Sequence, residues 1–165
     1  MKKDLCSQNK ENEKMKVNIP PNLNLKEVKC FNEIVKPQLE ELYSYSYDQF
    51  GFKHTKIFIS KDKFSDDAKR PDIEEIKNIL SKIQEKYLKF VLEIYFVSYH
   101  CKDDNPKEIK GRTLPIIYKI IIYPKAYDRL KVILTHEIGH IVFEKGLTKE
   151  LKQLFPWSYY RHFQI

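Results

Sequence analysis

The segment from about Ala126 to Lys145 places titratable side chains within an otherwise apolar helical pattern, and this combination limits how the chain can fold. At 100° per residue, one side of the predicted helix, roughly 120–200° from His136, is apolar, and it consists of Leu130, Leu134, Ile138 and Ile141. On the same scale His140 falls near 40°, on the face of His136. We therefore expect a helix, ended by Gly146, that packs one side into a core and presents two imidazoles on another face.

Within this helix, His136, Glu137 and His140 form the pattern H-E-x-x-H. Imidazoles one turn apart can each direct a nitrogen at one Zn²⁺, about 2.0–2.1 Å away. Glu137 lies beside that face, where it can reach a water without taking a coordination position. The pattern predicts Zn²⁺ as cofactor, with His136 and His140 as metal ligands and Glu137 as the catalytic general base. The alternative is a helix with two hydrogen-bonded histidines and no metal.

The rest of the chain alternates helical and extended patterns. Helices are predicted over 25–35, 37–50, 72–90 and 148–155, and strands over 54–60, 91–99 and 115–123. The stretch 91–99 is too apolar for an exposed edge strand, so an internal position in the sheet is expected. Asp72, with Glu75 three residues later, resembles a capping box, and the polar stretch 100–112 is predicted to be a loop. The strands can pair in antiparallel fashion and are mixed with helices, so the predicted fold class is α+β.

Composition and cysteine usage predict the domain organisation and the location. Residues 1–22 are polar and are expected to form a flexible tail, and 23–165 a single domain. The longest apolar stretch, 115–123, is far shorter than the roughly 20 residues needed to span a bilayer, so no membrane span is expected. Three widely spaced cysteines, and no apolar stretch after the first lysines, predict a reducing compartment without a secretory signal, with a cytoplasmic location as the default.

The net charge of +7 and the pI of about 9.1 suggest attraction to acidic partners. Only four of the 30 basic residues are arginines, the residues that bind phosphate in bidentate fashion. A basic module that binds nucleic acid or an acidic partner is therefore the weaker alternative to a metal-dependent enzyme. The sequence does not indicate an oligomeric state.

The stretch from Ile116 to Phe143, which ends in VILTHEIGHIVF, resembles the active-site strand and helix of the zincin metallopeptidases. The resemblance implies a zincin-like domain with a small, twisted, mostly antiparallel sheet, whose edge strand lies over the H-E-x-x-H helix and aligns a peptide or protein substrate. Ile116 to Tyr123 would be that edge strand, His136 and His140 the zinc ligands and Glu137 the base. In element order the SprT-like and the lethal-factor-like peptidases are the most similar branches.

Catalytic zinc takes three protein ligands and one open position, so a third ligand is needed. We predict His162 for this role, with Glu150, a ligand outside this chain, or none as the alternatives. Glu144 shares the helix but lies about 12 Å from His136, too far to join the same ion. Lethal-factor-like proteins use a glutamate on a helix beyond the end of this sequence, so the domain could lack a C-terminal part.

One pattern separates the chain from the metzincin branch. The metzincin pattern H-E-x-x-H-x-x-G-x-x-H is not continued, because Phe143 and Gly146 occupy its last two positions. Tyr159 and Tyr160 are candidates for a second donor to the oxyanion. A zincin-like protein that uses its metal structurally, or binds none, is the remaining alternative function.

Overall fold

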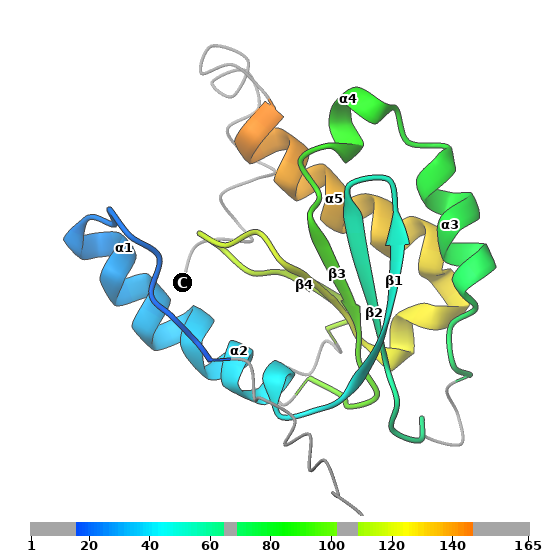
Figure 1. The fold of residues 1–165 in the computed structure, drawn as a ribbon, viewed down its shortest axis with the longest axis horizontal. Coiled ribbons are helices and arrows are strands. Elements are labelled where there is room, and N and C mark those ends of the chain that lie inside the picture. The colour runs from blue at the N-terminus through cyan, green and yellow to red at the C-terminus, as the bar shows by residue number, and fades with distance from the viewer. Residues whose placement is uncertain (1–15, 65–68, 102–108, 147–165) are drawn as a thin grey trace, which may run out of the picture.

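Five strands form one sheet in the order β1-β2-β3-β5-β4, as shown in a computed structural model that describes residues 16–64, 69–101 and 109–146 (Figure 1). The strands are β1 (Tyr47–Phe52), β2 (Thr55–Ser60), β3 (Glu93–Phe96), β4 (Gly111–Thr113) and β5 (Ile120–Ile122). The helices are α1 (Leu25–Cys30), the π-helical η1 (Phe31–Val35), α2 (Lys36–Tyr43), α3 (Ile73–Ser81), α4 (Glu85–Leu88), the 3₁₀-helical η2 (Pro124–Arg129) and α5 (Leu130–Gly146).

The predicted α+β class is confirmed, but the sheet is mixed rather than mostly antiparallel. The pairs β1–β2 and β4–β5 are antiparallel, whereas β2–β3 and β3–β5 are parallel. Parallel neighbours require a long crossover, and the segment that carries α3 and α4 provides it between β2 and β3.

Alternate residues of the three central strands enter two separate cores on the two faces of the sheet. Ile57, Ile94 and Ile120 pack with α3, α4 and α5 on one face. Their neighbours Phe58 and Tyr95, whose rings stack with centroids 4.4 Å apart, pack with η1 and α2 on the other. Because strand side chains alternate between faces, a strand covered by helices on both sides is apolar throughout. The predicted strand 91–99 is therefore internal, as its composition indicated.

The N-terminal helices run as one continuous rod that includes a π-helical turn directly before Pro37. Proline has no N–H and its ring crowds the carbonyl four residues earlier, so the wider turn keeps the helix unbroken. The Lys36 N–H bonds to Phe31 O, five residues back. Helix α2 ends at Tyr43, not near Phe50 as predicted, because 47–52 pair with β2 instead.

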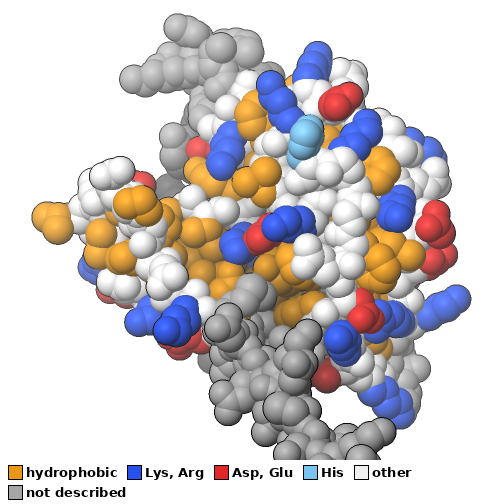
Figure 2. Space-filling model, in the orientation of Figure 1, with side chains coloured by type: hydrophobic (Ala, Val, Ile, Leu, Met, Phe, Trp, Pro, Cys, Tyr) orange, Lys and Arg blue, Asp and Glu red, His pale blue; other side chains and the backbone are white. Residues whose placement is uncertain are grey.

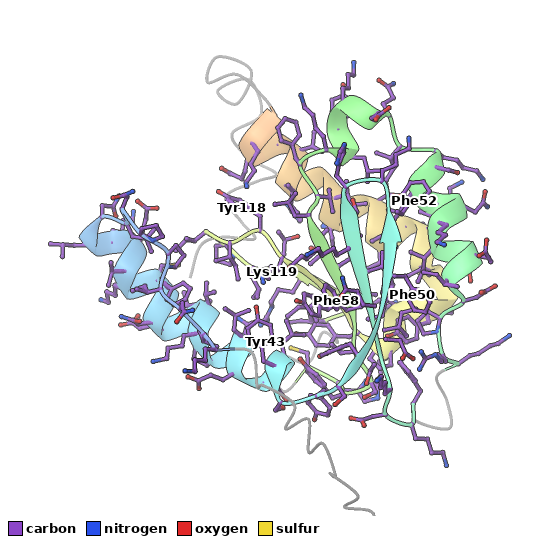
Figure 3. All side chains as sticks on the ribbon, in the orientation of Figure 1. Tyr43, Phe50, Phe52, Phe58, Tyr118 and Lys119 are labelled. Carbon is purple, nitrogen blue, oxygen red and sulfur yellow. The ribbon has the colours of Figure 1, made fainter. Side chains whose placement is uncertain are left out.

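Side chains from separate elements hold α2 against the start of β5. Lys119 Nζ donates to the Tyr43 hydroxyl at 2.7 Å and pairs with Glu93 (Figure 3). Burial lowers the pKa of Lys119, but its bonds to Glu93 and Tyr43 outweigh this effect and leave the pKa raised. In the same view Phe50 and Phe52 extend from β1, and both pack against the core that contains α3.

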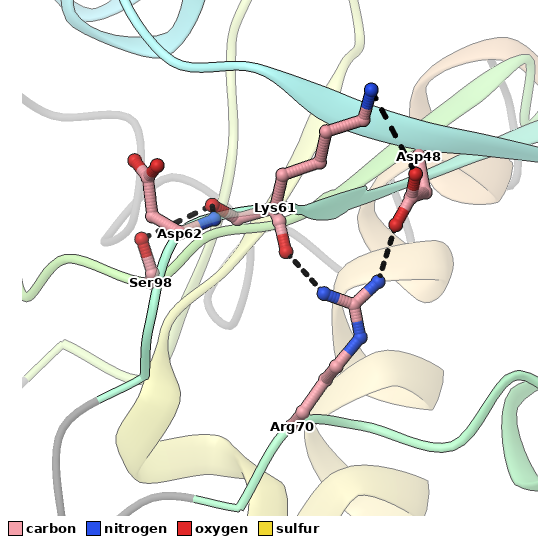
Figure 4. A network of polar contacts seen from close by, with 6 residues as sticks. Asp48, Lys61, Asp62, Arg70 and Ser98 are labelled. Carbon is pink, nitrogen blue, oxygen red and sulfur yellow. Dashed lines mark hydrogen bonds and ion pairs between the residues drawn. The ribbon is translucent and has the colours of Figure 1, made fainter.

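The predicted helix 72–90 is divided into α3 and α4. The Asp72 side chain caps α3 by accepting from Glu74 N, so its partner is not the Glu75 of the expected capping box. Just before this cap, Arg70 donates to Ser60 O at 2.6 Å and to Asp48 Oδ2 at 2.8 Å (Figure 4). These bonds attach the start of α3 to the β1–β2 side of the sheet.

Among the described strands, the edge of the sheet near α5 is β4, which corrects the assignment of Ile116 to Tyr123 as the edge strand. Only Ile120–Ile122 of that stretch is extended, and β5 lies between β3 and β4. Residues 115–118 form the turn between β4 and β5, with Ile116 and Tyr118 at positive φ. This turn is apolar because Ile116 packs into the core around α2 and Tyr118 into the core around α5. The strand β4 begins at Gly111, within the stretch predicted to be a loop.

The long helix starts as a 3₁₀ turn at Pro124 and becomes α-helical at Leu130. Gly146 belongs to α5 and does not have the positive φ expected of a helix-ending glycine. A Cβ at this position would lie 3.0 Å from the Phe90 ring, so close packing is the reason for glycine there. The predicted helix 148–155 lies outside the described residues.

Buried tyrosines predict that alkaline pH destabilises the protein. Burial raises the pKa of Tyr95, Tyr123 and Tyr127 above the ordinary value of about 10. A raised folded-state pKa stabilises the protein fully below the unfolded value, and this stabilisation is lost as the pH rises toward the folded value. The free energy of unfolding, measured in urea, should fall above about pH 10. Tyrosinate absorbance from these side chains should appear together with unfolding, and ionisation of all tyrosines in the folded protein would contradict this prediction.

Candidate metal centre

Helix α5 packs against the sheet with its apolar side, as the periodicity of the sequence predicted. Leu130, Leu134, Ile138 and Ile141 are buried in the core between α5 and the sheet. Lys131 and Thr135, on another side of the helix, are exposed. This rotation of the helix leaves His136 exposed to solvent and places Glu137 at the border between the core and the surface.

The two histidines direct the same ring atom at each other. His136 Nε2 and His140 Nε2 lie 3.0 Å apart, and the rings are nearly perpendicular with centroids 4.5 Å apart. This separation suits either a hydrogen bond between the two imidazoles or a shared cation. His140 is only 9% exposed, so the pair lies at the border of the protein interior.

Glu137 lies next to this pair and is held by the edge strand β4. Its side chain is 6% exposed. The Thr113 hydroxyl donates to Glu137 Oε2 at 2.8 Å and lies 3.2 Å from Glu137 O. At Gly111 an added Cβ would lie 3.0 Å from Glu137 Cγ, so the strand and the glutamate are in direct contact. Burial of a carboxylate is costly without hydrogen-bond donors, and Thr113 supplies one.

The residues present fit a divalent metal such as Zn²⁺. Two nitrogens bound to one ion with tetrahedral geometry would be about 3.3–3.4 Å apart, close to the observed separation. One ligand atom from each of His136, Glu137 and His140 lies within 4.8 Å of the others, which makes these three residues a possible metal-binding group. Imidazole nitrogens are ligands that suit Zn²⁺. The structure brings the two predicted ligands, His136 and His140, together.

The third zinc ligand is not decided by the described residues. His162 and Glu150, the two candidates within the chain, lie outside them, as do Tyr159 and Tyr160. Within 16–64, 69–101 and 109–146, the group of three from α5 is the sole cluster of potential ligands, and Glu144 is not part of it. The prediction for His162 therefore remains a prediction.

Sequence reasoning did not identify Gly111 and Thr113 as site residues. Both lie in a short polar segment between Pro106 and Pro115 that has no clear strand pattern. Glycine at position 111 was the available signal, since a glycine within a strand often marks the close approach of another element. Only the pairing of β4 with β5 shows which element approaches.

A cavity of about 620 Å³ lies near the starts of α3 and η2, away from the histidines. Charged side chains of both signs line it: Lys69, Arg70, Asp72, Glu75, Lys110, Lys125 and Asp128. Because the charges are mixed, the cavity does not select a ligand class. The exposed His54 and His100 belong to no metal-binding group in the described part of the chain.

Comparisons with known proteins return no counterpart, because no family model, no curated protein and no solved structure matches this chain. Among the helices of the described ranges, none has both the length and the apolar run required to cross a bilayer.

The geometry predicts that zinc binding depends on both histidines. Calorimetric titration of the full chain with Zn²⁺ should show binding that is largely lost in His136→Ala and in His140→Ala, because each variant removes one of two converging nitrogens. Zinc at about 100 times its dissociation constant should stabilise the wild type by about 2.7 kcal/mol. The matched control His54→Ala removes an exposed histidine from the β1–β2 turn and should bind as the wild type does. Equal binding by all four proteins would place the metal elsewhere.

Proposed function

We propose that this protein is a zinc-dependent metallopeptidase of the zincin type, which hydrolyses peptide bonds with Glu137 as general base. The observation that carries this proposal is the convergence of His136 Nε2 and His140 Nε2 to 3.0 Å, with a buried carboxylate alongside. A carboxylate beside two converging imidazoles is what a hydrolytic site needs as its general base.

Each of the three residues has a separate role in the proposed reaction. His136 and His140 would hold the ion, which supplies Lewis acidity by making water easier to deprotonate near neutral pH and by polarising a carbonyl. Glu137 accepts a proton from the attacking water and passes it to the leaving nitrogen. Because Thr113 engages Oε2, Oε1 is the oxygen that we assign to this proton transfer.

The backbone groups on the outer side of β4 are evidence for a peptide as the substrate. Lys110 O accepts from Tyr123 N, and Leu114 N donates to Lys119 O, so alternate residues of this segment bond inward to β5 and its flanking residues. In an antiparallel pair the residues between them direct their N–H and C=O outward. These are Gly111 and Thr113, which also contact Glu137. Among the described residues no strand pairs with this side, and an extended peptide added there would pass the base.

The described residues on one face of the molecule do not favour the nucleic-acid alternative. On the face shown in Figure 2, lysine and arginine side chains are dispersed among hydrophobic and acidic ones and do not form one patch. Nucleic-acid binding normally uses a clustered basic surface. The metal centre, rather than the net charge, is therefore the basis of the proposed function.

Replacing the proposed base should separate zinc binding from catalysis. Glu137→Gln keeps the shape of the side chain but cannot accept the proton, so zinc binding should persist while turnover of a generic peptide library falls about 10²- to 10⁴-fold. Zinc content is measured by elemental analysis and turnover by mass spectrometry of the products. Glu74→Gln, at an exposed position on α3, is the matched control and should behave as the wild type does.

Two results would contradict the proposal. Full turnover by Glu137→Gln would show that Glu137 is not the base. If the zinc-loaded wild type cleaves no peptide of the library, the chain is not a general peptidase, and the non-catalytic alternative is then favoured.

A further inference from the structure

We propose that Thr113 is a positioning residue, which orients Glu137 for proton transfer from the strand that would also bind the substrate. The inference rests on the proposed function, because it assigns a role within the same site. It concerns two residues of β4, Gly111 and Thr113, that the H-E-x-x-H pattern does not include.

The contact between Thr113 and Glu137 is specific in its atoms. The Thr113 side chain is 7% exposed, and its hydroxyl donates to Glu137 Oε2 at 2.8 Å. A buried hydrogen bond to a charged group is stronger than one between neutral groups. The β-branched threonine has a restricted χ1 angle, so the donor is held in place by the backbone of β4.

Gly111, at the other end of the strand, gives the side chain of the same glutamate the space that it occupies. An added Cβ would lie 3.0 Å from Glu137 Cγ, 3.1 Å from Glu137 Oε1 and 3.0 Å from Ile133 Cγ2. Such distances are shorter than ordinary contacts, so a larger residue would displace the carboxylate. Gly111 therefore leaves room for Oε1, while Thr113 binds Oε2.

Register explains why these two residues act together. Gly111 pairs with Ile122 and Thr113 with Ile120, and both isoleucines belong to the core beneath α5. The Thr113 side chain therefore faces α5, as would a Cβ added at Gly111. Arg112, between them, faces the opposite side of the sheet and donates to Gln38 Oε1 at 2.7 Å. A substrate strand bound along β4 would contact the residues that orient the base. The same strand would then fix the positions of both the Glu137 carboxylate and the scissile bond.

The test compares full-length, zinc-loaded variants. Thr113→Val removes the hydroxyl with little change in shape, and kcat should fall about 10- to 100-fold because the carboxylate loses its orientation. Zinc affinity and KM should stay near the wild-type values. Thr113→Ser retains the donor and should recover most of the lost kcat, whereas Gly111→Ala should lower kcat without loss of zinc.

Thr55→Val is the matched control. Thr55 is also a buried strand threonine, and its hydroxyl donates to Val91 O at 2.6 Å, on β2 and away from the site. This variant should lose stability but retain kcat. If Thr113→Val keeps the wild-type kcat, or if zinc affinity falls in parallel with kcat, the positioning role is wrong.

A second readout does not depend on turnover. In protein with ¹³C-labelled glutamate, the Glu137 side chain should give one carboxyl signal in the wild type and in Thr113→Ser, and a shifted or broadened signal in Thr113→Val. If the wild type cleaves no peptide, the proposed function fails, and this signal still tests the orientation of Glu137. An unchanged signal in Thr113→Val would overturn the positioning role even in an active enzyme.

Discussion

The packing of one side of α5 against the sheet is the interaction on which the candidate site depends. Leu130, Leu134, Ile138 and Ile141 are almost completely buried, and each contributes about 1.5–3 kcal/mol of burial free energy. Together they determine how the helix is rotated about its axis. That rotation leaves His136 exposed and places His140 and Glu137 at the border of the core, with Glu137 against β4.

The site thus combines a contact between residues close in sequence with a contact between residues far apart in sequence. The two imidazoles are neighbours because they are one helical turn apart, so any helix with this sequence brings them together. The carboxylate of Glu137 is different, because its partner Thr113 lies 24 residues earlier in the chain. Its orientation depends on the turn at 115–118, on the pairing of β4 with β5 and on the close approach that Gly111 permits.

Particular elements show why some of the fold was predictable and some was not. The strand 54–60, the internal position of 91–99 and the apolar side of α5 follow from local periodicity and were predicted. The apolar run 115–123 was predicted to be one strand although only Ile120–Ile122 is extended, because burial in a turn and burial in a strand leave the same composition. The segment Gly111–Thr113 was missed, since three polar or small residues become a strand only through pairing. The mixed direction of the strands likewise depends on the crossover through α3 and α4.

By itself, the amino-acid sequence determined that two histidines and a glutamate lie on one helix with an apolar side, because helix geometry is set by neighbours within four residues. Tertiary structure alone decided which strand lies against Glu137, which oxygen of its carboxylate is held and which side of β4 stays open among the described residues. The physical reason is that strand pairing and side-chain burial join residues far apart in the chain, and a local pattern contains no information about its distant partners.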